Sequence, residues 1–146
     1  MSQRWWALDA NVVITTIREQ REGHGFHALQ ERFGRRLCLP GTVAAELLAG
    51  ARNDLARRAT RRLLERFAEG RPILVPSATA FFEQGRVLAA LADDYGTALG
   101  GVRAAVANDV LIAVTCREHD ATLVTATARD FVPIQRHLRG FRLETT

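Results

Sequence analysis

Five short apolar segments, separated by stretches with helical spacing, constrain the fold of this sequence more than any other feature. They are residues 4–8, 37–39, 73–75, 122–125 and 141–143. Short apolar runs of this kind are typical of strands that are buried on both faces, and the helical stretches between them predict crossover connections. We therefore expect an α/β fold with a central parallel sheet of four to five short strands, flanked by helices on both faces.

The longest helical pattern is amphipathic. It begins at Asn53, and we expect Leu55, Leu63 and Phe67 on its buried face, with Gly70 ending the helix. The sequence has no internal repeat, no low-complexity linker and no break in composition. We therefore expect one domain that spans residues 1–146.

The charge balance favours an anionic partner. The net charge is +4, and all 20 basic residues are arginines. A basic protein of this kind is suited to bind nucleic acid or an acidic protein segment. An arginine-rich chain without lysine is also what a GC-rich genome produces, so the composition alone does not choose between these explanations.

Cysteines and hydropathy exclude several classes of protein. Cys38 and Cys116 lie in apolar surroundings without a second cysteine or a histidine at metal-binding spacing, which predicts buried free thiols. No apolar run reaches the roughly 18 residues that a membrane span needs. The N-terminus lacks a signal-peptide pattern, so we expect a cytoplasmic protein without membrane contact.

Three carboxylates lie in unusually apolar sequence. Asp9 is in WALDANVVI, Glu46 in VAAELLAG and Asp109 in AAVANDVLIAV, whereas acids such as Glu83 and Glu118 are expected to face solvent. A buried ionised carboxylate costs several kcal/mol unless it is paired, hydrogen-bonded or bound to a cation. Three such acids suggest a shared hard divalent cation, Mg²⁺ or Mn²⁺, which prefers carboxylate oxygens.

Each acid also has an ordinary structural explanation. Asp9 and Asp130 could cap the helices that follow them, and Glu46 could lie on the exposed face of an amphipathic helix. Asp109 could share the N-cap of a helix with Asn108, where the helix dipole stabilises a negative charge by about 0.3–1 kcal/mol. These alternatives stay open from the residues alone.

Three motifs together resemble the PIN-domain ribonucleases, and within them the VapC-type toxins of prokaryotic toxin–antitoxin pairs. They are LDANVVI at 8–14, VAAELLAG at 43–50 and NDVLIAVTCREHDATLVTATARDF at 108–131. The resemblance covers nearly the whole chain, in order and at the usual spacings. It implies a PIN-like fold with a parallel sheet between helices.

The resemblance also implies the site. The acidic positions of the family pattern are matched here by Asp9, Glu46, Asp109 and Asp130. Asp9 and Asp109 would be the main contacts of Mg²⁺ or Mn²⁺, and the other two acids would act directly or through water. Polar side chains beside these acids would support them: Asn11, Asn108, Thr125 and Thr127.

This sequence departs from the family pattern at two positions. Ala10 stands where the family often has Thr or Ser, although Asn11 keeps a polar group next to it. Thr127 stands where the family often has Asp or Asn, so the hydroxyl adds no charge there and Asp130 is the nearest acid.

The activity implied is that of a metal-dependent endoribonuclease that activates water for attack on RNA of the tRNA or rRNA class. The implied partners are a cognate VapB-like antitoxin and a second copy of the chain in a homodimer. One alternative is a PIN nuclease in RNA or DNA processing outside a toxin system. Another is a degenerate, non-catalytic PIN module that only binds RNA or protein.

Overall fold

The core of the structure is a five-stranded parallel sheet in the order β3-β2-β1-β4-β5. The computed structural model describes residues 4–21, 25–97, 101 and 103–146. The strands are β1 (Trp5–Leu8), β2 (Leu37–Pro40), β3 (Ile73–Leu74), β4 (Ala121–Thr125) and β5 (Arg142–Thr145). All five expected strands are present, which confirms the predicted parallel sheet.

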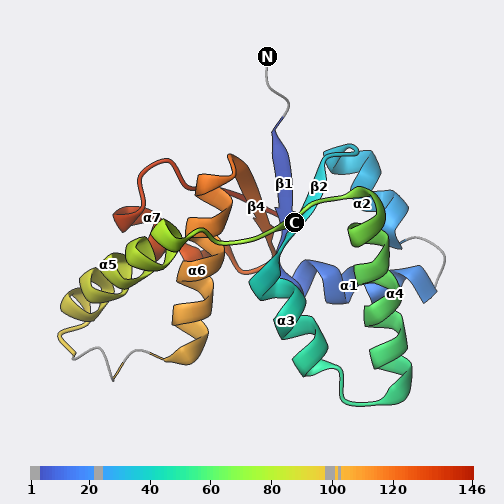
Figure 1. The fold of residues 1–146 in the computed structure, drawn as a ribbon, viewed down its shortest axis with the longest axis horizontal. Coiled ribbons are helices and arrows are strands. Elements are labelled where there is room, and N and C mark those ends of the chain that lie inside the picture. Colours follow the sequence, from blue (N-terminus) through green and yellow to red (C-terminus); the bar gives the residue numbers. More distant parts are fainter. Residues whose placement is uncertain (1–3, 22–24, 98–100, 102) are drawn as a thin grey trace.

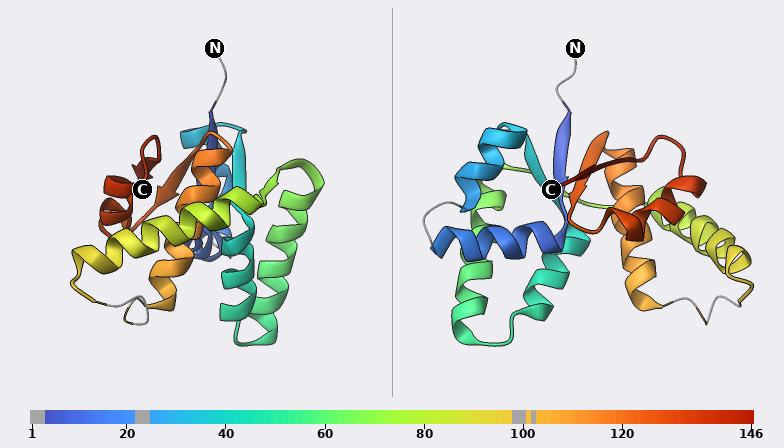
Figure 2. Two further views of the ribbon diagram at one scale, coloured as in Figure 1. Left: turned by 60° about the vertical axis from the view of Figure 1, so that its left-hand side comes forward. Right: turned by 180° about the vertical axis from the view of Figure 1, so that it is seen from behind.

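Seven helices of the described chain connect and cover the strands. They are α1 (Ala10–Arg21), α2 (Gly25–Phe33), α3 (Gly41–Gly50), α4 (Asp54–Gly70), α5 (Ala78–Asp94), α6 (Ala104–Glu118) and α7 (Ala128–His137). Helices α1–α4 lie on one side of the sheet and α5–α7 on the other (Figures 1 and 2). This follows from the strand order, since right-handed crossovers change face when the chain reverses direction after β3.

The strand order brings distant segments to one edge of the sheet. β1 pairs with β4 along its whole length, from Trp5 opposite Ala121 to Leu8 opposite Val124. Every residue of β2 and β4 is buried, as expected for strands covered on both faces. The residue after β1 and the last residue of β4 therefore meet at the carboxyl edge, where parallel sheets bind ligands.

The alternative in which Asn108 and Asp109 share the N-cap of a helix was wrong. The helix begins at Ala104, five residues before Asp109, and its N-cap residue Arg103 makes no side-chain cap hydrogen bond. Asp109 is therefore inside the helix and gains no stabilisation from its N-terminus, and Asn108 does not cap it. The apolar residues around Val106 continue the same helical pattern, and this continuity outweighed the local cap signal.

The face of α4 that was predicted to be buried is buried only in part. Leu63 and Phe67 are in the core, as predicted, and Asn53 caps the helix by accepting from the backbone amide of Ala56 at 2.8 Å. The prediction for Leu55 was wrong, because this side chain is 58% exposed. It lies in the first turn of α4, where an open groove faces α1.

Two acids expected to face solvent have specific partners instead. Glu83 on α5 accepts hydrogen bonds from Arg86 at 2.9 Å and from Arg117 at 3.3 Å, and these arginines hold its pKa below the usual range. Glu118 accepts from both the backbone amide and the hydroxyl of Ser77. A helical pattern relates residues three or four positions apart, so it cannot predict a partner that is 41 positions away.

Cys38 and Cys116 are free and buried, as predicted, and burial raises the pKa of the Cys38 thiol to about 12. None of the helices in the described ranges has the length and apolar character needed to cross a bilayer.

Candidate functional site

Asp9 is the buried centre of the candidate site. It follows β1 directly, is only 6% exposed, and its backbone amide donates to the carbonyl of Val124 at 3.0 Å. Its Oδ1 accepts from the amide of Ala10 and its Oδ2 from the hydroxyl of Thr125, both at 2.8 Å. Each carboxylate oxygen has two lone pairs, so one on each oxygen is left for another ligand.

The alternative of Asp9 as a conventional helix cap is not favoured. A capping side chain accepts from the second or third amide of the helix. Here the amides of Val12 and Val13 donate to the backbone carbonyl of Asp9 at 3.1 and 3.2 Å. Burial raises the pKa of Asp9, and the bonds from Thr125 and Ala10 lower it only in part.

Glu46 joins the site from α3. Its side chain is half-buried, and its Oε1 accepts from Nδ2 of Asn108 on α6 at 3.2 Å. Burial raises the pKa of Glu46, the bond from Asn108 lowers it, and the charge of Asp9 raises it. The predicted alternative of a solvent-facing Glu46 was therefore wrong.

Asp109 has the most strongly perturbed carboxyl group of the four. It lies half-buried in α6, next to Asn108. Burial is the first cause of a rise in its pKa to about 7, and the charges of Asp9, Glu46 and Asp130 raise it further. Four carboxylates, one after β1 and one each on α3, α6 and α7, therefore act on one another electrostatically.

Asp130 lies at the rim of this cluster. It is in the first turn of α7, with a side chain that is 53% exposed, and Nε of Arg129 lies 3.9 Å from its Oδ1. An exposed pair at this distance contributes little. The charge of Asp130 nonetheless raises the pKa of both Asp9 and Asp109, so it lies close enough to act on both.

A network of polar side chains closes the site on the β4 side. Nδ2 of Asn11 donates to the hydroxyls of Thr125 at 3.3 Å and Thr127 at 3.1 Å, and its Oδ1 accepts from the amide of Ala126 at 3.1 Å. The amide of Thr127 donates to the Thr125 hydroxyl at 3.1 Å. These are the polar residues that the sequence placed beside the acids, together with Asn108.

The donor chemistry suits a hydrated hard cation. The cluster offers carboxylate oxygens, and their mutual repulsion is what a divalent ion relieves. Within the described residues, no three side chains of Asp, Glu, His or Cys are placed closely enough to hold one ion together. Mg²⁺ retains several waters and binds through one or two carboxylates, so the residues fit a hydrated ion.

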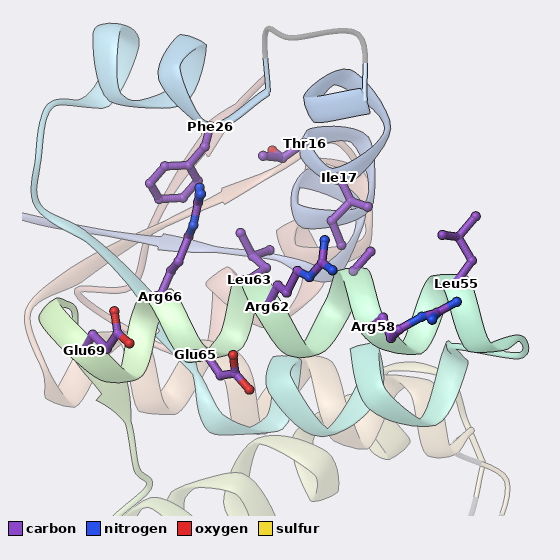
Figure 3. A pocket seen from close by; sticks show the side chains of 11 residues that line it. Thr16, Ile17, Phe26, Leu55, Arg58, Arg62, Leu63, Glu65, Arg66 and Glu69 are labelled. Atoms are coloured by element: carbon purple, nitrogen blue, oxygen red, sulfur yellow. The ribbon is translucent and has the colours of Figure 1, made fainter.

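Two grooves run beside α1. The smaller, with a volume of about 360 Å³, is lined by Ala10, Arg18 and Glu46 among others, so it adjoins the acids. The larger, about 670 Å³, lies between α1, α2 and α4, and Ile17 lines both. Its other lining residues include Phe26, Leu55, Arg58, Arg62 and Arg66 (Figure 3).

No pattern in the amino-acid sequence indicated the larger groove. Its walls come from helices that are well separated along the chain, and the position of Leu55 suggested a core residue. The exposure of Leu55 is evident only once α1 and α4 are placed side by side.

The protein is similar to known proteins both in sequence and in structure. The family model of the PIN domain matches residues 7–132, whereas no curated protein matches. A chain of DNA-bound VapBC from Salmonella typhimurium superposes with a TM-score of 0.67 at 26% identity, over 97% of this chain and 98% of that chain.

Two further solved structures share the fold. A chain of VapBC2 from Rickettsia felis, bound to a DNA fragment from its promoter, has a TM-score of 0.65 at 22% identity and covers 96% of this chain and 97% of that chain. A chain of VapBC-1 from nontypeable Haemophilus influenzae has a TM-score of 0.60 at 19% identity, with 96% of each chain covered.

These matches confirm the resemblance that the three sequence motifs predicted. The matched range contains all four acids of the cluster. Because the family model spans most of the sequence and the sheet has the predicted parallel form, the chain belongs to the PIN domain family.

Proposed function

We propose that this protein is a VapC-like, metal-dependent endoribonuclease. The observation that carries the proposal is the shared electrostatics of the cluster: the pKa of Asp109 is raised to about 7 by burial and by three other carboxylates. Among the described residues, Asp9, Glu46 and Asp109 have no ion pair with an arginine or a histidine. Strongly perturbed acids without a basic partner are typical of a functional site.

The roles follow from the contacts. Asp9 and Asp109 would hold Mg²⁺ or Mn²⁺, which when bound polarises a phosphodiester and lowers the pKa of water. Asp9 is fixed through both oxygens, so it is preorganised to bind without further ordering. Asn108 holds Oε1 of Glu46, which leaves Oε2 to accept the proton of the attacking water. Asp130, at the rim of the cluster, would contact the metal ion directly or through a water molecule.

The proposed substrate is RNA of the tRNA or rRNA class. The resemblance to VapC-type proteins supports this choice, and the net charge of +4 agrees with a polyanionic substrate. The sequence and fold also fit a PIN nuclease in RNA or DNA processing outside a toxin system, so the substrate has to be identified with mixed RNA and DNA pools.

The proposed protein partner is a VapB-like antitoxin. The solved neighbours are VapBC structures, and the groove along α1 and α4 has an exposed apolar wall at Leu55. An apolar wall edged by arginines suits an amphipathic segment with acidic residues (Figure 3). The resemblance also implies a homodimer, which sedimentation of the purified protein would test.

The decisive experiment compares Asp9→Asn and Asp109→Asn with Asp93→Asn, an exposed acid near the end of α5. With Mn²⁺ and a mixed RNA pool, the first two variants should lose cleavage by at least 100-fold while their circular dichroism stays unchanged. Asp93→Asn should cleave like the wild type. Full activity in Asp9→Asn or Asp109→Asn would contradict the proposal.

The alternative of a non-catalytic module makes a different prediction for metal binding. Calorimetry with Mn²⁺ should show binding in the wild type and its loss in Asp9→Asn. A degenerate module would show no binding that depends on these carboxylates.

A further inference from the structure

The orientation of the Asn11 side-chain amide is fixed by its neighbours. The backbone N–H of Ala126 can only donate, so the Asn11 atom 3.1 Å from it must be the oxygen. The nitrogen therefore faces the two threonines and supplies one proton to each hydroxyl oxygen, at 3.3 Å for Thr125 and 3.1 Å for Thr127. One lone pair of each threonine hydroxyl is therefore occupied by a proton of Asn11.

The Thr125 hydroxyl, which is fully buried, has no acceptor capacity left. A hydroxyl oxygen has two lone pairs. One accepts from Asn11 and the other from the backbone amide of Thr127 at 3.1 Å. Its single proton goes to Oδ2 of Asp9 at 2.8 Å, because a carboxylate is the stronger acceptor and the closer one.

The proton of the Thr127 hydroxyl therefore has no acceptor among these side chains. The Thr125 oxygen lies 3.3 Å away, but both its lone pairs are in use. Thr127 is the N-cap residue of α7, yet its side chain makes no cap hydrogen bond. The residue is half-buried, and its hydroxyl lies 3.3 Å from the Thr125 oxygen that binds Asp9, so its proton is available to a ligand that binds beside Asp9.

We propose that the Thr127 hydroxyl is a hydrogen-bond donor to a non-bridging phosphate oxygen of the substrate, with Asn11 as the residue that directs it. The proposal rests on the proposed nuclease function and assigns a substrate contact to the position where this chain departs from the family pattern. The N-terminal end of α7 favours an anion at the same place. An anionic oxygen is the acceptor that gains most from a preorganised hydroxyl.

The test uses three variants of the full chain. Thr127→Val removes the hydroxyl with little change in shape, Thr127→Ser keeps it, and Thr79→Val is a matched control on the exposed first turn of α5. Calorimetry measures the affinity for Mn²⁺ alone and then for inorganic phosphate in saturating Mn²⁺. Steady-state kinetics on the cleaved RNA give KM and kcat.

The expected result separates phosphate binding from metal binding. Thr127→Val should bind Mn²⁺ within twofold of the wild type, bind phosphate about tenfold more weakly and raise KM for RNA. Thr127→Ser should restore phosphate binding, and Thr79→Val should match the wild type throughout.

Three outcomes would overturn the proposal: unchanged phosphate affinity in Thr127→Val, an equal loss of Mn²⁺ affinity, or no Mn²⁺-dependent phosphate binding in the wild type. Failure of the proposed nuclease function would give a different set of binding and cleavage results. In that case the wild type binds Mn²⁺ and phosphate, and Thr127→Val weakens the phosphate, but no RNA is cleaved.

Discussion

The Thr125 hydroxyl donates to Oδ2 of Asp9 over 2.8 Å although the two residues are 116 positions apart in the sequence. The bond joins the carboxyl ends of β1 and β4, which are neighbours in the sheet. With the amide of Ala10 on the other oxygen, it fixes the plane of a carboxylate that is 6% exposed. The geometry of the acid cluster therefore depends on a neutral side chain.

The first prediction concerns this bond. Thr125→Val keeps the shape of the buried side chain but leaves Asp9 held on one oxygen only. We expect Mn²⁺ affinity to fall by roughly 10- to 100-fold, the usual effect of removing a group that orients a metal ligand. Calorimetry checks this, and Thr125→Ser should bind Mn²⁺ nearly as well as the wild type. If both variants lose affinity equally, loss of packing rather than of the hydroxyl is responsible.

The second prediction concerns pH. The pKa of Asp109 is about 7 in the folded protein and 3.8 as its ordinary value. Between these values the folded state binds more protons than the unfolded state, so stability must fall as pH rises from about 4 to 7. In EDTA, the contribution of Asp109 should lower the free energy of unfolding by on the order of 1–3 kcal/mol between pH 4 and pH 7.5, because solvent screening reduces the effect of a carboxyl that is only half-buried.

The comparison with Asp109→Asn isolates this residue from other titrating groups. At pH 7.5 without metal, urea unfolding should show the variant to be more stable than the wild type, and the difference should vanish near pH 4. Adding Mg²⁺ at pH 7.5 should stabilise the wild type more than the variant. A wild type that is the more stable protein at pH 7.5 in EDTA would show that the charge of Asp109 is compensated in some other way.

The third prediction concerns the two thiols. Burial raises the pKa of Cys38 to about 12 and that of Cys116 well above its ordinary value. Because the thiolate is the reactive form, neither residue should react with a thiol reagent in the native protein at pH 8. Both should react in guanidinium chloride. Rapid labelling under native conditions would contradict this prediction and would mean that β2, for Cys38, or α6, for Cys116, opens locally.

The fourth prediction concerns the groove beside α1. Leu55 is 58% exposed, so Leu55→Ser should leave the melting temperature within about 2 °C of the wild type, as for a surface substitution. If an antitoxin segment occupies the groove, its affinity should fall by about tenfold. Val75→Ser is the control, since Val75 is 66% exposed and does not line the groove. Equal affinity for all three proteins would exclude this groove as the antitoxin site.

The amino-acid sequence determined the strands well because each is a short apolar run that has to be buried on both faces. It also identified Asp9, Glu46 and Asp109 by the cost of placing a carboxylate in such surroundings. It left the start of α6 open, because an Asn-Asp pair looks like a cap although apolar residues upstream extend the helix to Ala104. Helix caps depend on backbone geometry, which a local pattern does not contain.

What the sequence by itself determined is the class of fold, the family and the residue types available to the site. Only the tertiary structure decided how they meet. Three hydrogen bonds join segments that are more than 60 positions apart in the sequence. They run from Asn108 to Glu46, from Thr125 to Asp9 and from Asn11 to Thr127. Hydrogen bonds and pKa values depend on distances of a few ångströms, and those distances are set by the strand order that places β4 beside β1 and by the packing of α3 against α6.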